Sequence, residues 1–247
     1  MNAIYILWLR ELKRYFRSRS RMIGSLGQPL LFLLALGFGL GPIFQKAGQG
    51  SYFQFLGPGV ICMSILFTAI FSGIQVIWDK QFGFLKETLV APIPRLHIML
   101  GKTLGGATIA TFQGIVVFFL AVLFGFRPEL TLLPLTVLYM LLVAVFFTGL
   151  GITIASLLED INGFQIIMNF LVQPLFFLSG ALFPLNNLPK AISIVTSFDP
   201  LTYGVDGIRG TLIGVSHFGL MLDFITLVVL TLCVLTIGAY FFSKIQI

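Results

Sequence analysis

Six stretches of this chain contain no Asp, Glu, Lys or Arg, and each is long enough to cross a bilayer as a helix. They cover residues 22–45, 47–78, 103–126, 130–158, 161–189 and 224–243. The shortest holds 20 residues, which spans roughly 30 Å at about 1.5 Å per residue and matches a hydrocarbon core. The pattern predicts an all-α integral membrane protein with transmembrane helices over about residues 22–45, 53–78, 103–126, 131–157, 163–183 and 222–243.

The composition supports this interpretation, because 57% of the residues are hydrophobic and only 10% are charged, against about 25% in soluble domains. The segments between the spans are too short to bury a core of their own. We therefore expect one transmembrane domain over residues 1–247 and no soluble catalytic domain. The first apolar run is too long for a signal peptide and lacks a small-residue cleavage pattern. Cysteines and histidines form no cluster with metal-ligand spacing, so no metal is expected.

Lysine and arginine predict the orientation, because loops rich in them stay on the cytoplasmic side. If the chain starts inside, 11 of these residues face the cytoplasm and 4 face outward. Six spans then place both termini in the cytoplasm. The net charge of +6 favours contact with anionic membrane lipids, and no domain is left to bind nucleic acid.

The first 21 residues predict an amphipathic connecting helix that lies at the membrane interface. Apolar residues recur at steps of three and four, and basic residues occupy the opposite face; the residues that mark the helix are Trp8, Arg10, Arg14 and Phe16. Trp8 is expected at the headgroup boundary. The basic face is typical of a topology signal and also of a mechanical element, and both roles remain open.

Residues 79–102 form the predicted cytoplasmic loop between the second and third spans. Within it, a short helix is expected to carry the apolar and charged residues Phe82, Leu85, Lys86, Glu87 and Leu89, and Ala91-Pro92-Ile93-Pro94 ends that helix because proline cannot continue the hydrogen-bond ladder. Such a helix either lies on lipid or fits a groove of a partner protein. The pattern alone does not decide between them.

Gly101-Lys102-Thr103 looks like the end of a phosphate-binding loop, but Leu96 stands where that loop needs its first glycine. Lys102 is therefore interpreted as a marker of the membrane boundary. Nothing else in the sequence is typical of a nucleotide site, so any ATP chemistry must come from another polypeptide.

The outer segment, residues 184–219, is apolar yet interrupted by prolines, and it predicts a re-entrant pair of short helices packed on other protein. Asp199 is expected to cap the second helix, with Pro200 in its first turn. Asp206 and Arg209, three residues apart, are expected to neutralise each other.

Polar residues inside the spans are candidates for a substrate path: Gln28, Pro29, Gln75, Asn169 and Gln173, with Gln113 as a further buried amide. Amides in hydrocarbon usually pair across helices, so an interhelical role remains the main alternative for each of them. We expect no buried carboxylate inside the spans, which disfavours a proton-coupled carrier or an ion channel.

Two long ordered patterns resemble a known family. One runs from Trp78-Asp79 through Pro92-Ile93-Pro94-Arg95 to Gly101-Lys102, and the other from Leu178-Ser179-Gly180-Ala181-Leu182-Phe183-Pro184-Leu185 through Asp199-Pro200-Leu201-Thr202-Tyr203 to Asp206 and Arg209. The chain resembles the type-2 permease subunits of ATP-binding-cassette exporters, especially the daunorubicin-resistance and nodulation lipo-oligosaccharide branch. Relatives often carry an acidic residue in place of Gln81 and Asn in place of Asp199.

The resemblance implies a homodimer in a prokaryotic cell membrane, with each copy bound to a separate ATP-binding subunit that holds ATP and Mg. It implies that the loop around Phe82 to Glu87 and the connecting helix couple to that subunit, and that Asp199, Pro200, Tyr203, Asp206 and Arg209 belong to re-entrant outer helices. An amphipathic drug, lipid or lipid-linked glycan is the expected cargo. The alternatives are a membrane-embedded enzyme, for which Ser179-Gly180 lacks the required upstream glycine, and a non-transporting anchor for a cytoplasmic partner.

Overall fold

The computed structural model describes residues 3–46, 51–90, 93–185 and 189–244, and every regular element in these ranges is a helix. In chain order they are α1 (Ala3–Arg17), α2 (Arg19–Lys46), α3 (Tyr52–Phe71), α4 (Ile74–Gln81), α5 (Phe84–Val90), α6 (Arg95–Leu123), α7 (Leu133–Leu157), α8 (Ile161–Leu178), α9 (Lys190–Phe198), α10 (Pro200–Ile213) and α11 (Leu220–Ser243). Six candidate spans are long and apolar enough to cross a membrane: α2, α3 with α4, α6, α7, α8 and α11. The predicted all-α fold with six spans is confirmed.

Several helix ends differ from the predicted spans. The helix α6 begins at Arg95 instead of residue 103. The prediction began too late because it used a stretch without charged residues, whereas a helix accepts charged residues in its first turns. The helix α8 ends at Leu178 instead of residue 183, and Gly180 follows with a φ of +74° that favours glycine. The predicted second span is two helices, α3 and α4, separated by Ser72 and Gly73.

The centre of the bundle consists of α3, α6 and α7. In the apolar part of these spans, between 50% and 72% of the residues are buried, against 17% to 22% in α2, α8 and α11. The break between α3 and α4 rests directly on α7, because a Cβ at Gly73 would overlap the carbonyl of Gly151 and a Cβ at Gly151 would overlap the carbonyl of Ile70. The surrounding helices α2, α8 and α11 leave large apolar faces that no other described residue covers.

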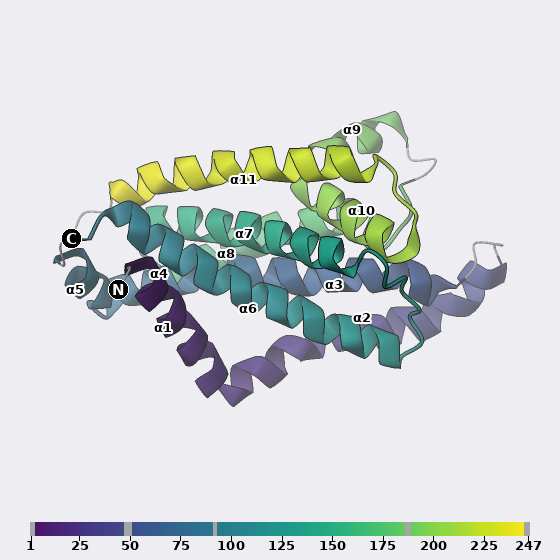
Figure 1. Cartoon of the computed structure of the whole chain (residues 1–247), viewed down its shortest axis with the longest axis horizontal. Coiled ribbons are helices and arrows are strands. Elements are labelled where there is room, and N and C mark those ends of the chain that lie inside the picture. Colours follow the sequence, from purple (N-terminus) through teal and green to yellow (C-terminus); the bar gives the residue numbers. More distant parts are fainter. Residues whose placement is uncertain (1–2, 47–50, 91–92, 186–188, 245–247) are drawn as a thin grey trace.

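Figure 1 shows that α5, the start of α1 and the end of α11 lie at one end of the molecule, while α9 and α10 lie toward the other. The predicted cap of α10 is confirmed: the Asp199 side chain accepts a hydrogen bond from the Leu201 N–H, and Pro200 opens the helix. The helix α10 is buried against the bundle, whereas most of α9 is exposed. Within the described residues, only α10 of the two short helices is therefore packed on other protein of this chain.

Two electrostatic expectations for the outer end are wrong. Asp206 does not pair with Arg209 in the described part of the chain, because its carboxylate accepts hydrogen bonds from the backbone N–H groups of His217 and Phe218. Arg209 instead donates to the Gly180 carbonyl at 2.9 Å. The sequence also predicts no buried carboxylate inside the spans, but Asp223, in the first turn of α11, is fully buried. The prediction missed it because the charge-free stretch begins at residue 224.

Candidate functional site

The end of α4 carries a buried ion cluster that joins three helices. Asp79 is 2% exposed, and Lys102 of α6 forms an ion pair with its Oδ2. From α1, Arg10 Nη2 lies 3.2 Å and Arg14 Nη1 3.7 Å from Asp79 Oδ1, while Glu11 Oε1 lies 3.9 Å from Lys102 Nζ. These five residues, Arg10, Glu11, Arg14, Asp79 and Lys102, are called the ion cluster below.

Burial determines which of these contacts matters most. Asp79 and Lys102 are both almost completely removed from solvent, so each depends on the other to offset its lost hydration. The side chains of Arg10 and Arg14 are 36% and 37% exposed and contribute less, as partly solvated ion pairs do. The cluster therefore fixes α4 against α6 strongly and against α1 more loosely.

The next two residues attach α4 to the end of α7. Lys80 Nζ donates to the carbonyl oxygens of Ala155, Ser156 and Leu158 at 3.2, 2.7 and 3.1 Å. A cation there satisfies carbonyls that the helix leaves unpaired and faces the negative end of its dipole. Gln81 Nε2 adds a bond to the Glu159 carbonyl at 3.1 Å. The helix α4 is thus held by α1 and α6 on one side and by α7 on the other.

The short helix α5 follows directly and presents apolar side chains to the outside. Gly83 connects it to α4 with a φ of +80°, a conformation that residues with a Cβ rarely adopt. Phe82 and Phe84 are 71% and 51% exposed, and Glu87 is exposed as well. Leu85, one of the residues predicted for the coupling helix, is 2% exposed and belongs to the core, whereas Phe84, which is not a predicted site residue, is exposed. The side chains of Lys86 and Leu89 lie outside the described part of the structure.

Beside α5 a groove of about 690 Å³ runs along α1. It is lined by Ile6, Leu9, Arg10, Lys13, Arg14, Arg17 and Phe84. The guanidinium of Arg10 lies 5.9 Å from the centre of the Phe84 ring, so the groove and α5 are continuous. Its basic and apolar lining residues suit a partner surface that offers acidic and hydrophobic side chains.

The connecting helix is confirmed as a helix, but its packing corrects two expectations. It ends at Arg17, and Arg21 belongs to α2. Its buried side chains are Leu7, Glu11 and Tyr15, not the apolar face that the sequence predicts. The Trp8 indole N–H donates to Thr108 Oγ1 of α6 at 3.0 Å, and Phe16 packs edge-on against Phe112. Hydrophobic periodicity missed this face because Glu11 is buried by its ion pair.

Lys102 has a contact that the sequence does not predict. It is 4% exposed and forms an ion pair with Asp79 within the ion cluster. Gly101-Lys102-Thr103 lies inside α6, as expected of a sequence that only resembles a phosphate-binding loop. Neither Asp79 nor Glu11 is a predicted site residue. The signal available in the sequence is a carboxylate just after one predicted span and a lysine just before the next.

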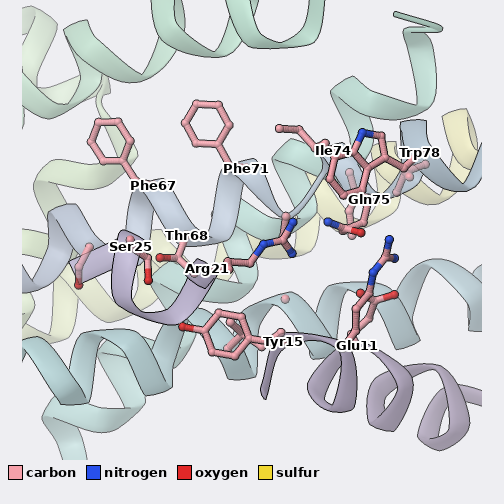
Figure 2. Close-up of a pocket in the computed structure, with 18 of the residues that line it drawn as sticks. Glu11, Tyr15, Arg21, Ser25, Phe67, Thr68, Phe71, Ile74, Gln75 and Trp78 are labelled. Carbon is pink, nitrogen blue, oxygen red and sulfur yellow. The ribbon is translucent and has the colours of Figure 1, made fainter. Parts of the chain in front are cut away.

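A second cavity, of about 400 Å³, lies between α1, α2, α3, α4 and α6 and also borders α7 and α8 (Figure 2). Gln28, Pro29 and Gln75, three of the residues predicted for a substrate path, line it. Asn169 and Gln173 do not, and their side chains are exposed on α8. The amide of Gln113 serves an interhelical role, because its Oε1 accepts a hydrogen bond from Tyr15 Oη at 2.9 Å.

The bundle and its junction at α4 define a multi-spanning membrane protein with an exposed helical surface at one end. The chain belongs to the ABC-2 type transporter family, whose model matches residues 2–213. It is 30% identical over 213 residues to Nodulation protein J of Rhizobium leguminosarum bv. trifolii, covering 85% of this chain and 78% of that protein. It is 27% identical over 233 residues to the inner membrane transport permease YadH of Escherichia coli (strain K12), covering 92% of this chain and 89% of that protein. The predicted family is confirmed, and with it the general role of a transport permease.

Proposed function

We propose that this chain is the permease subunit of an ATP-driven exporter in the cell membrane. Two copies form the path for an amphipathic drug, lipid or lipid-linked glycan, and a separate subunit binds and hydrolyses ATP with Mg. That subunit docks on the groove of α1 together with Phe82 and Phe84, which face the cytoplasm along with both termini. The observation that carries this proposal is the ion cluster, because it connects the exposed docking surface to the membrane spans.

The coupling step follows from the attachments of α4. A force on α5 passes through Gly83 to α4, which cannot move without α1, α6 and α7 because Asp79 and Lys80 tie it to all three. Closure of the ATP-binding subunits therefore moves the inner ends of several spans together, as packed helices shift in discrete steps. Cargo then passes between the two copies.

The second copy is expected on α8. Its exposed face carries the amides of Asn169 and Gln173 between large apolar side chains such as Phe170. Amides facing lipid tails would lack hydrogen-bond partners, whereas a neighbouring helix supplies them. The exposed face of α11, the other weakly buried span, offers mainly apolar residues and suits lipid.

Coupling is tested in proteoliposomes that contain the chain and its ATP-binding subunit. Phe82→Ala and Glu87→Lys should reduce cargo-stimulated ATP hydrolysis severalfold while membrane insertion stays normal. Phe198→Ala on α9 is the matched control, since Phe198 is 82% exposed at the opposite end. Unchanged export by both α5 variants would remove α5 from the mechanism. Cargo-independent hydrolysis in the wild type would favour the anchor alternative.

The dimer is tested by cysteine cross-linking in a Cys233→Ala background. Asn169→Cys should form a cross-linked dimer, while Val229→Cys on the exposed side of α11 should remain monomeric. Equal cross-linking at both positions would show random collision, and efficient cross-linking only at Val229 would place the interface on α11.

The enzyme alternative receives no support at Ser179. Its hydroxyl is buried and donates to the Phe176 carbonyl at 2.8 Å, so it is engaged in a local helix-end contact.

A further inference from the structure

The cavity of about 400 Å³ has a polar part and an apolar part. Arg14, Arg21, Gln75 and Trp78 line the first, near the ion cluster. The second is formed by Pro29, Met63, Phe67, Phe71, Ile109 and Ile152. Its size falls within the range of about 300 to 1,000 Å³ usual for small-molecule sites. A ligand that fills it must carry a polar head and an apolar tail.

Arg21 supplies a positive charge that no carboxylate of the described residues contacts within ion-pair distance. It forms no ion pair within the described residues, while Arg10, Arg14 and Lys102 all reach Asp79. Figure 2 shows its side chain extending from α2 into the cavity in the direction of Gln75. Its guanidinium lies 5.9 Å from the centre of the Trp78 ring, which holds it beside an aromatic face.

Gln75 supplies an unsatisfied acceptor at the same place. The residue is 6% exposed, and its Oε1 is buried without a hydrogen-bond partner among the described residues. A buried carbonyl without a hydrogen-bond partner destabilises the protein, because it has lost its hydration without compensation. A ligand hydroxyl or ammonium group that donates to it would recover this free energy.

The charge around the cavity favours an anion. Four cations, Arg10, Arg14, Arg21 and Lys102, face two carboxylates, Glu11 and Asp79, which leaves two positive charges in excess. Guanidinium groups bind phosphate in a fixed fork geometry. Basic pockets between membrane helices on the cytoplasmic side are typical sites for anionic lipid headgroups.

We propose that this cavity is a binding site for an anionic phospholipid whose headgroup carries a hydroxyl group. The phosphate contacts Arg21, the hydroxyl donates to Gln75 Oε1, and an acyl chain lies against Phe67 and Phe71. The lipid would fill the angle between α1 and α2 and hold the connecting helix to the bundle. The site does not depend on transport, since it needs neither the ATP-binding subunit nor cargo.

Trp78 provides a direct test, because the chain contains only two tryptophans. In a Trp8→Phe variant of the full chain, Trp78 fluorescence reports on lipids brominated in the upper acyl chain. Brominated phosphatidylglycerol should quench Trp78 at about tenfold lower concentration than brominated phosphatidylcholine. Arg21→Gln should abolish most of this preference, and Gln75→Leu, an independent second variant of similar shape, should weaken it severalfold.

Arg19→Gln is the matched control, since Arg19 is exposed two residues away and does not line the cavity. The control should keep the preference for phosphatidylglycerol. Equal quenching by both lipids, an unaffected Arg21→Gln variant, or the same loss in Arg19→Gln would overturn the proposal. Displacement of the brominated lipid by soluble glycerol phosphate as effectively as by phosphatidylglycerol would also overturn it, because the site would then bind free phosphate. The assay uses the permease alone, so failure here and failure of the export function are separate results.

Discussion

Neutralising Asp79 is the most informative perturbation of the junction. In Asp79→Asn, the buried ammonium of Lys102 loses its contact partner and keeps only Glu11, at 3.9 Å. Arg10 and Arg14 lose the same partner, but both reach solvent. In this variant the buried charge of Lys102 therefore loses most of its compensation, while the two arginines keep theirs from water.

The expected magnitude follows from this difference. Breaking a buried ion pair by removing one partner costs about 3 to 5 kcal/mol. The two arginines are 36% and 37% exposed, so each adds at most about 1 kcal/mol. Asp79→Asn should thus destabilise the protein by about 3 to 5 kcal/mol, and Arg10→Gln or Arg14→Gln by about 1 kcal/mol or less.

Thermal unfolding in detergent and cargo-stimulated ATP hydrolysis give two readouts for each variant. The double variant Asp79→Leu with Lys102→Met removes both buried charges, so it should be more stable than Asp79→Asn. Its coupling should nevertheless stay impaired, because the contacts between α1 and α4 are lost. Glu159→Gln, an exposed carboxylate without an ion pair among the described residues, is the control. A double variant no more stable than Asp79→Asn, or Asp79→Asn as stable as the control, would refute this reasoning.

Three further predictions concern other parts of the fold. Burial raises the pKa of Asp199 to about 7, so the folded state favours the protonated form and loses stability as pH rises from about 4 to about 7. Asp199→Asn, which keeps a capping oxygen, should remove this loss when the free energy of unfolding is compared at about pH 5 and pH 8. An identical loss in the variant would contradict the prediction. Asp206→Ala should lower the free energy of unfolding by on the order of 3 kcal/mol, because the backbone N–H groups of His217 and Phe218 lose their acceptor. Asp206→Asn should lower it less, and equal unfolding midpoints for the two variants would disprove the contact. Gly151→Ala should destabilise by about 1 to 3 kcal/mol through overlap with the Ile70 carbonyl, whereas Gly41→Ala, which meets nothing, should be neutral, and similar costs at both sites would exclude the close approach.

The sequence predicts the spans well because soluble helices need charged residues on their solvent face, so a charge-free stretch as long as a bilayer is thick indicates lipid. Its limits lie where charge is buried. Glu11, Asp79 and Lys102 look like boundary residues in the sequence, yet in the structure they face one another inside the protein. Charge counting placed the start of α6 two turns late for the same reason, because it assumed that every cation is outside.

The exposed residues of α5 show a related limit. Periodicity grouped Phe82 with Leu85, because it has no information on the direction of the chain after Gly83. The positive φ of Gly83 reorients the helix, so Leu85 enters the core and Phe84 remains outside.

The position of the junction explains how one short helix can act on a whole bundle. Ser72 and Gly73, both in right-handed helical conformation, connect α4 to the buried part of α3. The contacts of Asp79 and Lys80 then transfer its position to three neighbouring helices. A lipid bound at Arg21 would occupy the remaining side of α4, through Gln75 and Trp78. Occupancy of that cavity should therefore change how closely α1 follows α4, and with it the coupling between the docking surface and the membrane spans.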